Sequence, residues 1–150
     1  MLLPLAGRGY SLFLGMNYWL LKSEPDVYSI DDLIREGEGV WDGVRNYQAR
    51  NNLRAMLPGD LALFYHSNIG MEVVGMIEIS TAAFHDPTTE DDRWFAVGVK
   101  PVKKFKNTVP LKVLKSDPFF EDLTLVKHSR LSVMPVTKAH FDAILALSEA

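Results

Sequence analysis

A tryptophan in an unusual place gives the strongest chemical signal in this sequence. Trp41 is followed by Asp42, Gly43, Arg45 and Asn46, in a turn-rich segment that opens a predicted helix. A glycine-containing turn is a poor place to bury ~200 Å² of indole ring unless something covers it. Two interpretations stay open: the ring folds back over the core, or it forms a flat wall for a planar ligand. In the second case the Asn46 amide, which both donates and accepts hydrogen bonds, could recognise the ligand's edge.

Signatures of the common catalytic sites are mostly missing. The sequence has no glycine-rich phosphate loop, no dinucleotide-binding fingerprint and no nucleophile elbow. The histidines at positions 66, 85, 128 and 140 do not fall at the close spacing of a zinc motif. His66, at the end of a predicted strand, could be a general base, a hydrogen-bonding group of a pocket or a structural residue. We therefore predict a binding protein without catalytic residues, metal or cofactor.

Positive charge is concentrated in two short segments, although the formal net charge of the chain is −3. Residues 43–59 contain three arginines and no acid, and residues 100–115 contain six lysines and no acid. If the two segments converge, they form a track for phosphate groups; otherwise they are solvated cations on loops. Because the whole chain is not basic, a nucleic-acid ligand must be held by a local patch or a specific pocket.

The overall composition is that of one globular domain. The chain has 150 residues, of which 47% are hydrophobic and 23% charged. The lack of cysteine excludes disulfides and thiolate metal sites, and it fits the cytoplasmic location that we expect. No stretch approaches the ~18 apolar residues of a membrane span, so we expect no membrane association. Residues 1–15 are interpreted as an extension, either disordered or produced by a start codon placed upstream of the true start at Met16; the domain covers residues 16–150.

Several short strands are expected between a few short helices. The predicted strands cover residues 18–21, 61–66, 72–79, 94–99, 102–105, 123–126 and 131–136, with a hairpin turn at residues 67–70 and an edge or bend at Lys100–Pro101. This pattern predicts a small α+β domain built on a partly closed antiparallel barrel.

The helices have clear starts and apolar stripes. Ser29 and Asp32 form a predicted capping box, and the last helix starts at Thr137. The middle helix has its apolar stripe at Ala49, Leu53, Met56 and Leu57. We expect one core that includes Trp19, Leu20 or Leu21, Leu53, Leu63 and Ile144, with the last helix packed on the sheet.

Three sequence blocks are distinctive: residues 18–25 (YWLLKSEP), 41–51 (WDGVRNYQARN) and 64–68 (FYHSN). Together they resemble the EVE domain family, and residues 130–136 (RLSVMPV) fit as well. The likeness runs from about Met16 to Leu145, and the block at 41–51 is too long and specific for chance. Two departures concern the pocket rim: the loop between residues 86–88 and 93–94 is shorter than in many relatives, and residues 69–72 lack a proline that many relatives have.

The resemblance implies a PUA-like fold, a curled mixed or antiparallel, β-barrel-like sheet flanked by short helices. It also implies kinship with YTH domains, which hold a methylated base between aromatic side chains. EVE domains are generally taken to read modified bases in DNA or RNA, with modified cytosines as leading candidates. The residues that the resemblance assigns to ligand binding are Lys22, Ser23, Glu24, Trp41, Asn46, Tyr47, Ser67 and Asn68, and we expect phosphate contacts from Arg45 and Arg50.

The leading hypothesis is thus a nucleic-acid-associated reader of a modified base. An alternative is a PUA-like RNA-processing enzyme, a nuclease, in which Lys22, Arg45 and His66 supply acid, base and phosphate clamp. A third is a scaffold whose pocket binds a peptide. The sequence leaves open which modification is bound, whether the ligand is DNA, RNA or a free nucleotide, and the oligomeric state.

Overall fold

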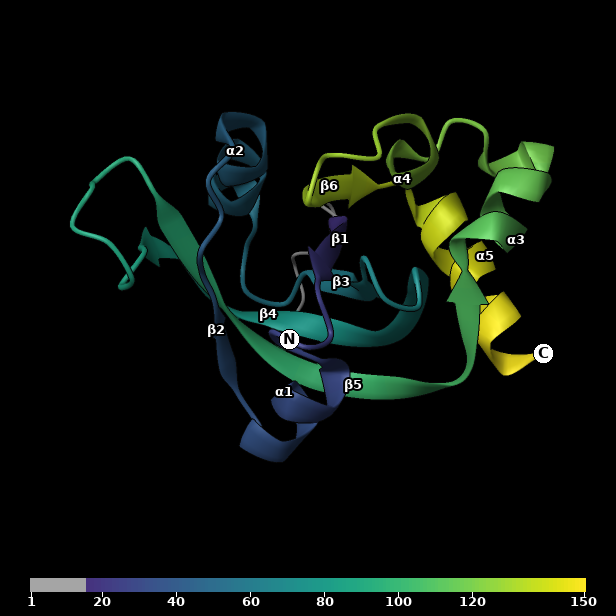
Figure 1. The fold of residues 1–150 in the computed structure, drawn as a ribbon, viewed down its shortest axis with the longest axis horizontal. Helices are drawn as coiled ribbons and strands as arrows, with labels where there is room; N and C mark the ends of the chain where they lie inside the picture. Colours follow the sequence, from purple (N-terminus) through teal and green to yellow (C-terminus); the bar gives the residue numbers. More distant parts are fainter. Residues whose placement is uncertain (1–15) are drawn as a thin grey trace, which may run out of the picture.

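The computed structural model describes residues 16–150, which form a six-stranded sheet surrounded by short helices (Figure 1). The strands are β1 (Tyr18–Ser23), β2 (Gly39–Trp41), β3 (Leu61–His66), β4 (Glu72–His85), β5 (Phe95–Pro110) and β6 (Val133–Val136). The helices are α1 (Ile30–Glu36), α2 (Tyr47–Ala55), α3 (Leu111–Ser116), α4 (Thr124–Lys127) and α5 (Lys138–Glu149), with a 3-10 turn at Pro118–Phe120. The predicted α+β class is confirmed.

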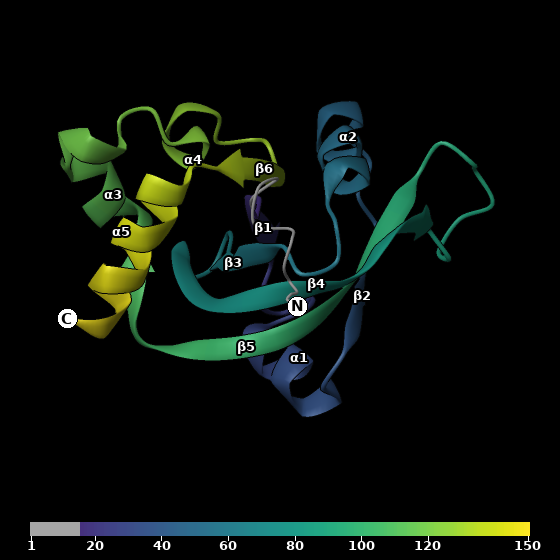
Figure 2. The same ribbon diagram turned by 180° about the vertical axis from the view of Figure 1, so that it is seen from behind.

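The sheet is mixed and curled. Its strand order is β2-β5-β4-β3-β1-β6, with β1 and β3 parallel and the other neighbouring pairs antiparallel. The long strands β4 and β5 run together along much of the molecule, as Figure 2 shows from behind. Their pairing shifts register at several points, and such bulges bend and twist a sheet. In the described residues the sheet ends at β2 and β6, so the predicted partial barrel is an open sheet.

The start of α1 confirms the predicted capping box and gives His66 a role. The Ser29 hydroxyl accepts from the Asp32 N–H at 3.0 Å, and the Asp32 carboxylate accepts from the Ser29 N–H at 2.9 Å. The next N–H, that of Ile30, donates to Nε2 of His66 at 3.1 Å. Since the first N–H groups of a helix lack partners within the helix, His66 satisfies one of them from the end of β3. Of the three roles considered for His66, the structure favours the structural one.

One core runs through the domain, as predicted. Trp19, Leu20, Leu21, Leu53, Leu63 and Ile144 all belong to a single buried cluster. α5 packs against β5, with Phe141 and Ile144 buried. On α2, Ala49, Leu53 and the following Met56 are buried, but Leu57 is 57% exposed. The prediction for Leu57 was wrong because the helix ends at Ala55, and the periodicity of a helix no longer places the residues that follow.

Two segments differ from the predicted strands. Residues 124–126 fall on the short helix α4, which Leu123 precedes as the N-cap, and the His128 N–H donates to the Thr124 carbonyl at 2.7 Å. The two strands predicted at 94–99 and 102–105 are one strand, β5, whose pairing with β4 shifts register where Pro101 lies. The sequence also missed β2, which pairs with β5 from residue 39 to 41.

The interpretation of residues 1–15 as an extension lies outside the described residues. Within residues 16–150, no helix is long and apolar enough to cross a membrane.

Acidification should destabilise the fold through His66. Burial lowers the pKa of His66 below its ordinary 6.5, so the unfolded chain binds this proton more readily than the folded one. The stability that neutral His66 contributes is complete above about pH 6.5 and is lost as the pH falls toward the folded-state pKa. Between pH 7.5 and 5, the free energy of unfolding in urea should therefore fall more for the wild type than for His66→Asn. An equal fall in both proteins would contradict this role.

Candidate functional site

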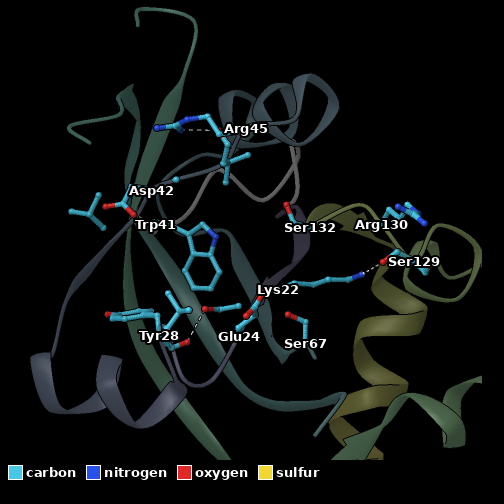
Figure 3. Close-up of a pocket in the computed structure, with 15 residues that line it drawn as sticks. Lys22, Glu24, Tyr28, Trp41, Asp42, Arg45, Ser67, Ser129, Arg130 and Ser132 are labelled. Carbon is cyan, nitrogen blue, oxygen red and sulfur yellow. Dashed lines mark hydrogen bonds between the residues drawn. The ribbon is translucent and has the colours of Figure 1, made fainter. Parts of the chain in front are cut away.

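A cavity of about 680 Å³ lies where the two edges of the curled sheet approach each other (Figure 3). One side belongs to the edge strand β2 and the residues after it, and the other to β1 and the loop that leads into β6. The lining residues are Lys22, Ser23, Glu24, Val27, Tyr28, Val40, Trp41, Asp42, Gly43, Val44, Arg45, Ser67, Ser129, Arg130 and Ser132. The volume falls in the range of pockets that hold small organic ligands, about 300–1,000 Å³.

Trp41 lines this cavity from a core position. It is the last residue of β2, paired opposite Val97, and its side chain is only 6% exposed. Its ring lies edge-on to Phe64, with centroids 5.2 Å apart, and to Tyr28 at 6.3 Å. The interpretation that the indole folds back over the core is therefore correct. The indole borders the cavity from that position. That a ligand contacts the face of this ring is a prediction.

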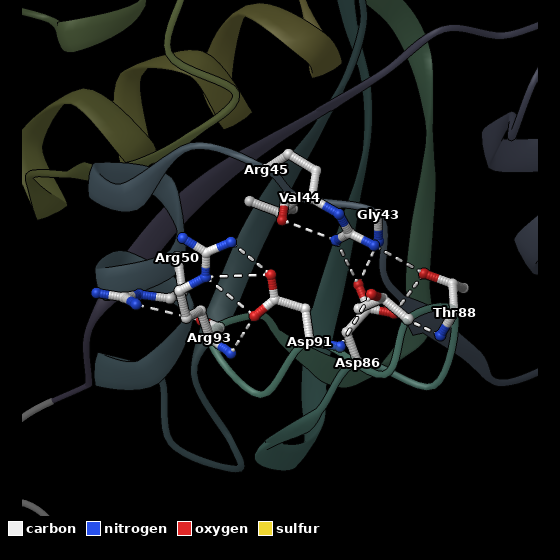
Figure 4. Close-up of polar contacts among 9 residues, drawn as sticks. Gly43, Val44, Arg45, Arg50, Asp86, Thr88, Asp91 and Arg93 are labelled. Carbon is white, nitrogen blue, oxygen red and sulfur yellow. Dashed lines mark hydrogen bonds and ion pairs between the residues drawn. The ribbon is translucent and has the colours of Figure 1, made fainter.

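A buried carboxylate fixes the backbone that follows Trp41 (Figure 4). Asp86 is fully buried and accepts from the Gly43 N–H at 2.8 Å and from Nη1 of Arg45 at 2.9 Å. It also accepts from the N–H and the hydroxyl of Thr88, at 2.7 and 2.6 Å. Burial alone would raise the pKa of Asp86, but these hydrogen bonds outweigh it and hold the pKa well below its usual range. The carboxylate thus stays charged and holds residues 43–45 in place.

The opposite side of the cavity is held by polar contacts of β1. Nζ of Lys22 donates to the Ser129 carbonyl at 2.6 Å, and the Lys22 N–H donates to the Ser132 carbonyl at 2.9 Å. Burial lowers the pKa of Lys22 from its ordinary value. The Ser23 hydroxyl donates to the Tyr28 carbonyl at 2.7 Å. An ammonium group therefore stands in the cavity opposite the Trp41 side, where it can donate hydrogen bonds to a ligand.

The structure brings six of the predicted site residues together at this cavity: Lys22, Ser23, Glu24, Trp41, Arg45 and Ser67. It places Asn46, Tyr47, Asn68 and Arg50 outside it. The side-chain oxygen of Asn46, Oδ1, caps α2 by accepting from the Ala49 N–H at 2.9 Å. This oxygen is therefore engaged in the helix cap and does not point to a ligand-binding role. Asn68 lies in the turn between β3 and β4, where its positive φ of 70° suits asparagine.

Tyr47 and Arg50 belong instead to a cluster of stacked groups beside the cavity. The rings of Tyr47 and Trp94 stack with centroids 5.2 Å apart, and the Arg50 guanidinium lies 5.0 Å from the Tyr47 ring. Arg93 donates to the Tyr47 hydroxyl at 2.9 Å and pairs with Asp91. Arg45 lies 5.6 Å from the Trp94 ring and joins this cluster to the cavity rim.

The two basic segments do not converge. α2, which carries Arg50 and Arg54, lies well apart from α3, which carries Lys112 and Lys115, in both views (Figures 1 and 2). Lys103 and Lys104 form ion pairs with Glu149 and Asp31, at 2.6 and 2.8 Å. Within residues 16–150 these observations favour the alternative of solvated lysines for the second segment.

Sequence reasoning missed several lining residues. Tyr28, Val44 and Asp42 were not assigned to a pocket, although Asp42 and Val44 lie inside the block at 41–51. The loop residues Ser129, Arg130 and Ser132 reach the cavity only because β6 pairs with β1, which is a contact between distant parts of the chain. Arg130 and Ser132 lie inside the block at 130–136, but no local pattern in the sequence assigns them to a pocket.

Comparison with known proteins decides the family. The EVE domain family matches residues 17–147. The chain belongs to the EVE domain family. Mouse thymocyte nuclear protein 1 is 39% identical over 168 aligned residues, which cover 89% of this chain and 74% of the mouse protein. The aligned length exceeds the 150 residues of this EVE protein, so the mouse protein has additional residues within the matched region.

Solved structures agree with this assignment. A crystal structure of a protein from Agrobacterium tumefaciens matches with a TM-score of 0.86 and 43% identity, over 88% of this chain and 92% of the other. The human THYN1 protein, solved in complex with DNA containing 5-methylcytosine, matches with a TM-score of 0.80 and 36% identity, over 89% and 98%. The YTH domain of Zygosaccharomyces rouxii MRB1, in complex with N6-methyladenosine RNA, has a TM-score of 0.58 at 19% identity, over 89% and 87%, and shares the fold.

Removing the buried charge at Asp86 should loosen the cavity wall. Asp86→Asn keeps the shape but loses the charged partner of Arg45 and leaves some of its four hydrogen bonds mismatched, so the free energy of unfolding should fall by about 2–4 kcal/mol. Urea unfolding at pH 7 measures this loss. Asp91→Asn, which breaks an exposed ion pair with Arg93, is the matched control and should lose much less. Equal losses in the two variants would contradict the anchoring role of Asp86.

Proposed function

We propose that this EVE domain is a reader that binds a modified base of DNA or RNA in the cavity between β1 and β2, with a modified cytosine as the favoured ligand. The observation that carries the proposal is the cavity itself, bordered by an indole on one side and an ammonium group on the other. The human THYN1 protein, a member of the same fold at 36% identity, has been solved with DNA that contains 5-methylcytosine.

The chemistry of the lining suits a flipped-out base. Trp41, Val44 and Tyr28 provide apolar surface for a planar ring, while Lys22 and the serines provide polar groups for its edge. Stacking of a base on an aromatic side chain contributes roughly 1–3 kcal/mol, and the low exposure of Trp41 favours the lower end. Extracting a base from a duplex costs a few kcal/mol. A single strand or a damaged site should therefore be bound more readily than an intact duplex.

Few cationic side chains near the cavity are available to bind the phosphates on either side of the base. Arg45 lies at the rim of the cavity but is paired with Asp86, and Arg93 is paired with Asp91. Arg50, in the stacked cluster, and Arg130, on the rim, have no carboxylate partner within residues 16–150. We retain Arg45 and Arg50 as phosphate contacts in this proposal and add Arg130.

A binding role without catalysis fits these contacts better than RNA cleavage. The nuclease alternative needs His66 beside Lys22 and Arg45, and His66 does not line the cavity. Its Nε2 accepts a hydrogen bond from the Ile30 N–H, which occupies the atom that would act as a base. Cytoplasmic location, and the choice between DNA and RNA, stay predictions.

A panel of fluorescently labelled single-stranded oligonucleotides tests the proposal. Each carries one central base that is unmodified, 5-methylcytosine, 5-hydroxymethylcytosine or N6-methyladenine, as DNA and as RNA. At least one modified strand, with 5-methylcytosine expected to be among them, should bind about tenfold more tightly than its unmodified counterpart. If every modified strand binds only as tightly as its counterpart, the domain is not a reader of these bases.

Lys22 should increase the affinity for the modified base through a direct hydrogen bond, and not through a general attraction between positive charge and nucleic acid. Lys22→Met keeps the apolar stem but removes the donor, and binding of the preferred modified strand should weaken about tenfold, or ~1.4 kcal/mol. Lys106→Met removes the same charge from an exposed position of β5 that does not line the cavity, and it should leave affinity nearly unchanged. Thermal unfolding of both variants checks that they are folded. Equal weakening by the two substitutions would show that Lys22 acts only through net charge.

The salt dependence of binding should be shallow. Because few cations near the cavity lack a carboxylate partner, we expect contact with about two to four phosphates, and a slope of log affinity against log salt of roughly −2 to −3. Fluorescence polarisation between 50 and 300 mM NaCl gives the slope. A slope near −8 would mean that phosphate attraction dominates and that the cavity contributes little.

A further inference from the structure

Two carboxylates line a cavity that is proposed to receive part of a polyanion. Glu24 and Asp42 both border it, and neither side chain has a hydrogen-bond or ion-pair partner within residues 16–150. The neighbouring Asp86 and Asp91, in contrast, are paired with Arg45 and Arg93. A carboxylate near phosphates is unfavourable unless it recognises a specific group. The acceptors of Glu24 and Asp42 are available to a ligand.

Asp42 is the better placed of the two. It directly follows Trp41, whose backbone is paired with β5, and it directly precedes Gly43, whose N–H donates to Asp86 at 2.8 Å. Its short side chain therefore extends from a backbone that is fixed on both sides. Glu24 has a longer side chain with more rotatable bonds, although its backbone carbonyl is held in the turn after β1 by the Val27 and Tyr28 N–H groups, each at 2.9 Å. Partial burial, and then the negative charge of Asp86, raise the pKa of Asp42, although the nearby Arg45 opposes this shift.

The chemistry of base edges tells which ligand would use such a carboxylate. Cytosine presents an exocyclic amino group, which donates, beside a ring nitrogen and a carbonyl oxygen, which accept. Thymine has the same ring size and presents a carbonyl oxygen where cytosine has the amino group. An ionised carboxylate only accepts, and the Lys22 ammonium only donates. Lys22 uses one of its three donors on Ser129 and has two left. Asp42 can therefore accept from the amino group of cytosine, whereas thymine would set its carbonyl oxygen against the carboxylate.

We infer that Asp42 is a specificity-determining residue that accepts a hydrogen bond from the exocyclic amino group of the bound base, so that the cavity selects amino-bearing bases and rejects their keto counterparts. This inference rests on the proposed function, since it requires a base in the cavity. The inference specifies the edge of the base that is recognised, the one with the amino group, and the side chain that recognises it, Asp42.

The test uses 5-methylcytosine and thymine, which share the ring and the methyl group and differ in the amino and keto edge. Both are placed at the same position of one single-stranded DNA oligonucleotide, and affinities are measured at pH 7.5. The wild type should prefer 5-methylcytosine by at least about tenfold. Asp42→Asn has the same shape, and its amide can also donate to the thymine oxygen, so the preference should shrink to about threefold or less. Glu121→Gln removes an equal charge from an exposed position outside the cavity and should keep the full preference.

The outcomes separate this inference from the proposed function. If the wild type binds 5-methylcytosine and thymine equally well, and both better than unmodified cytosine, the cavity reads the methyl group and the role of Asp42 is overturned. If Asp42→Asn is folded and keeps the wild-type preference, Asp42 is not the selector. If no modified strand of the panel exceeds its unmodified counterpart, the proposed function itself fails. A preference that collapses in Asp42→Asn and survives in Glu121→Gln supports both.

Discussion

The packing of Trp41 against Phe64 joins the edge strand β2 to the interior of the sheet and places the indole in the cavity wall. Phe64 lies on β3, inside the sheet, and Trp41 ends the edge strand β2, with the two rings 5.2 Å apart and nearly perpendicular. The indole also packs edge-on against Tyr28, with the ring centroids 6.3 Å apart, and both residues line the cavity. Trp41 therefore belongs both to the buried core and to the wall of the cavity.

The walls of this gap are held by contacts that do not depend on a ligand. Asp86 fixes residues 43–45 from one side, and the hydrogen bonds of Lys22 to Ser129 and Ser132 fix the other. A pocket that is already ordered pays less conformational entropy when it binds, so more of the contact energy appears as affinity. Arg45, at the rim, is paired with Asp86, while Lys22 and Asp42 line the cavity with unused donors and acceptors. This arrangement favours recognition of the edge of one base over attraction to phosphate.

Local signals in the sequence predicted the elements well, and contacts between distant residues decided the rest. The capping box of α1 and the buried stripe around Leu53 depend on residues within a few positions of one another, and both are confirmed. β2 was missed because three residues carry no periodicity and gain their partners only from β5. The anchoring of Gly43 by Asp86, 43 positions away, has no local trace either. Asn46 did carry a local signal, since asparagine is a preferred N-cap, but the family resemblance had assigned it to the ligand.

Contact between the bound base and Trp41 can be measured within one sample, because the chain has three tryptophans that can be observed separately. ¹⁹F NMR of protein labelled with 5-fluorotryptophan should give one resonance each for Trp19, Trp41 and Trp94. Trp19 is a built-in reference, because its indole N–H donates to the buried Asp60 carboxylate at 3.0 Å and it does not line the cavity. On titration with an oligonucleotide that contains 5-methylcytosine, the Trp41 resonance should shift and saturate with the measured affinity, while the Trp19 resonance should stay in place. Saturable binding that leaves the Trp41 resonance unmoved would put the base elsewhere and contradict the account.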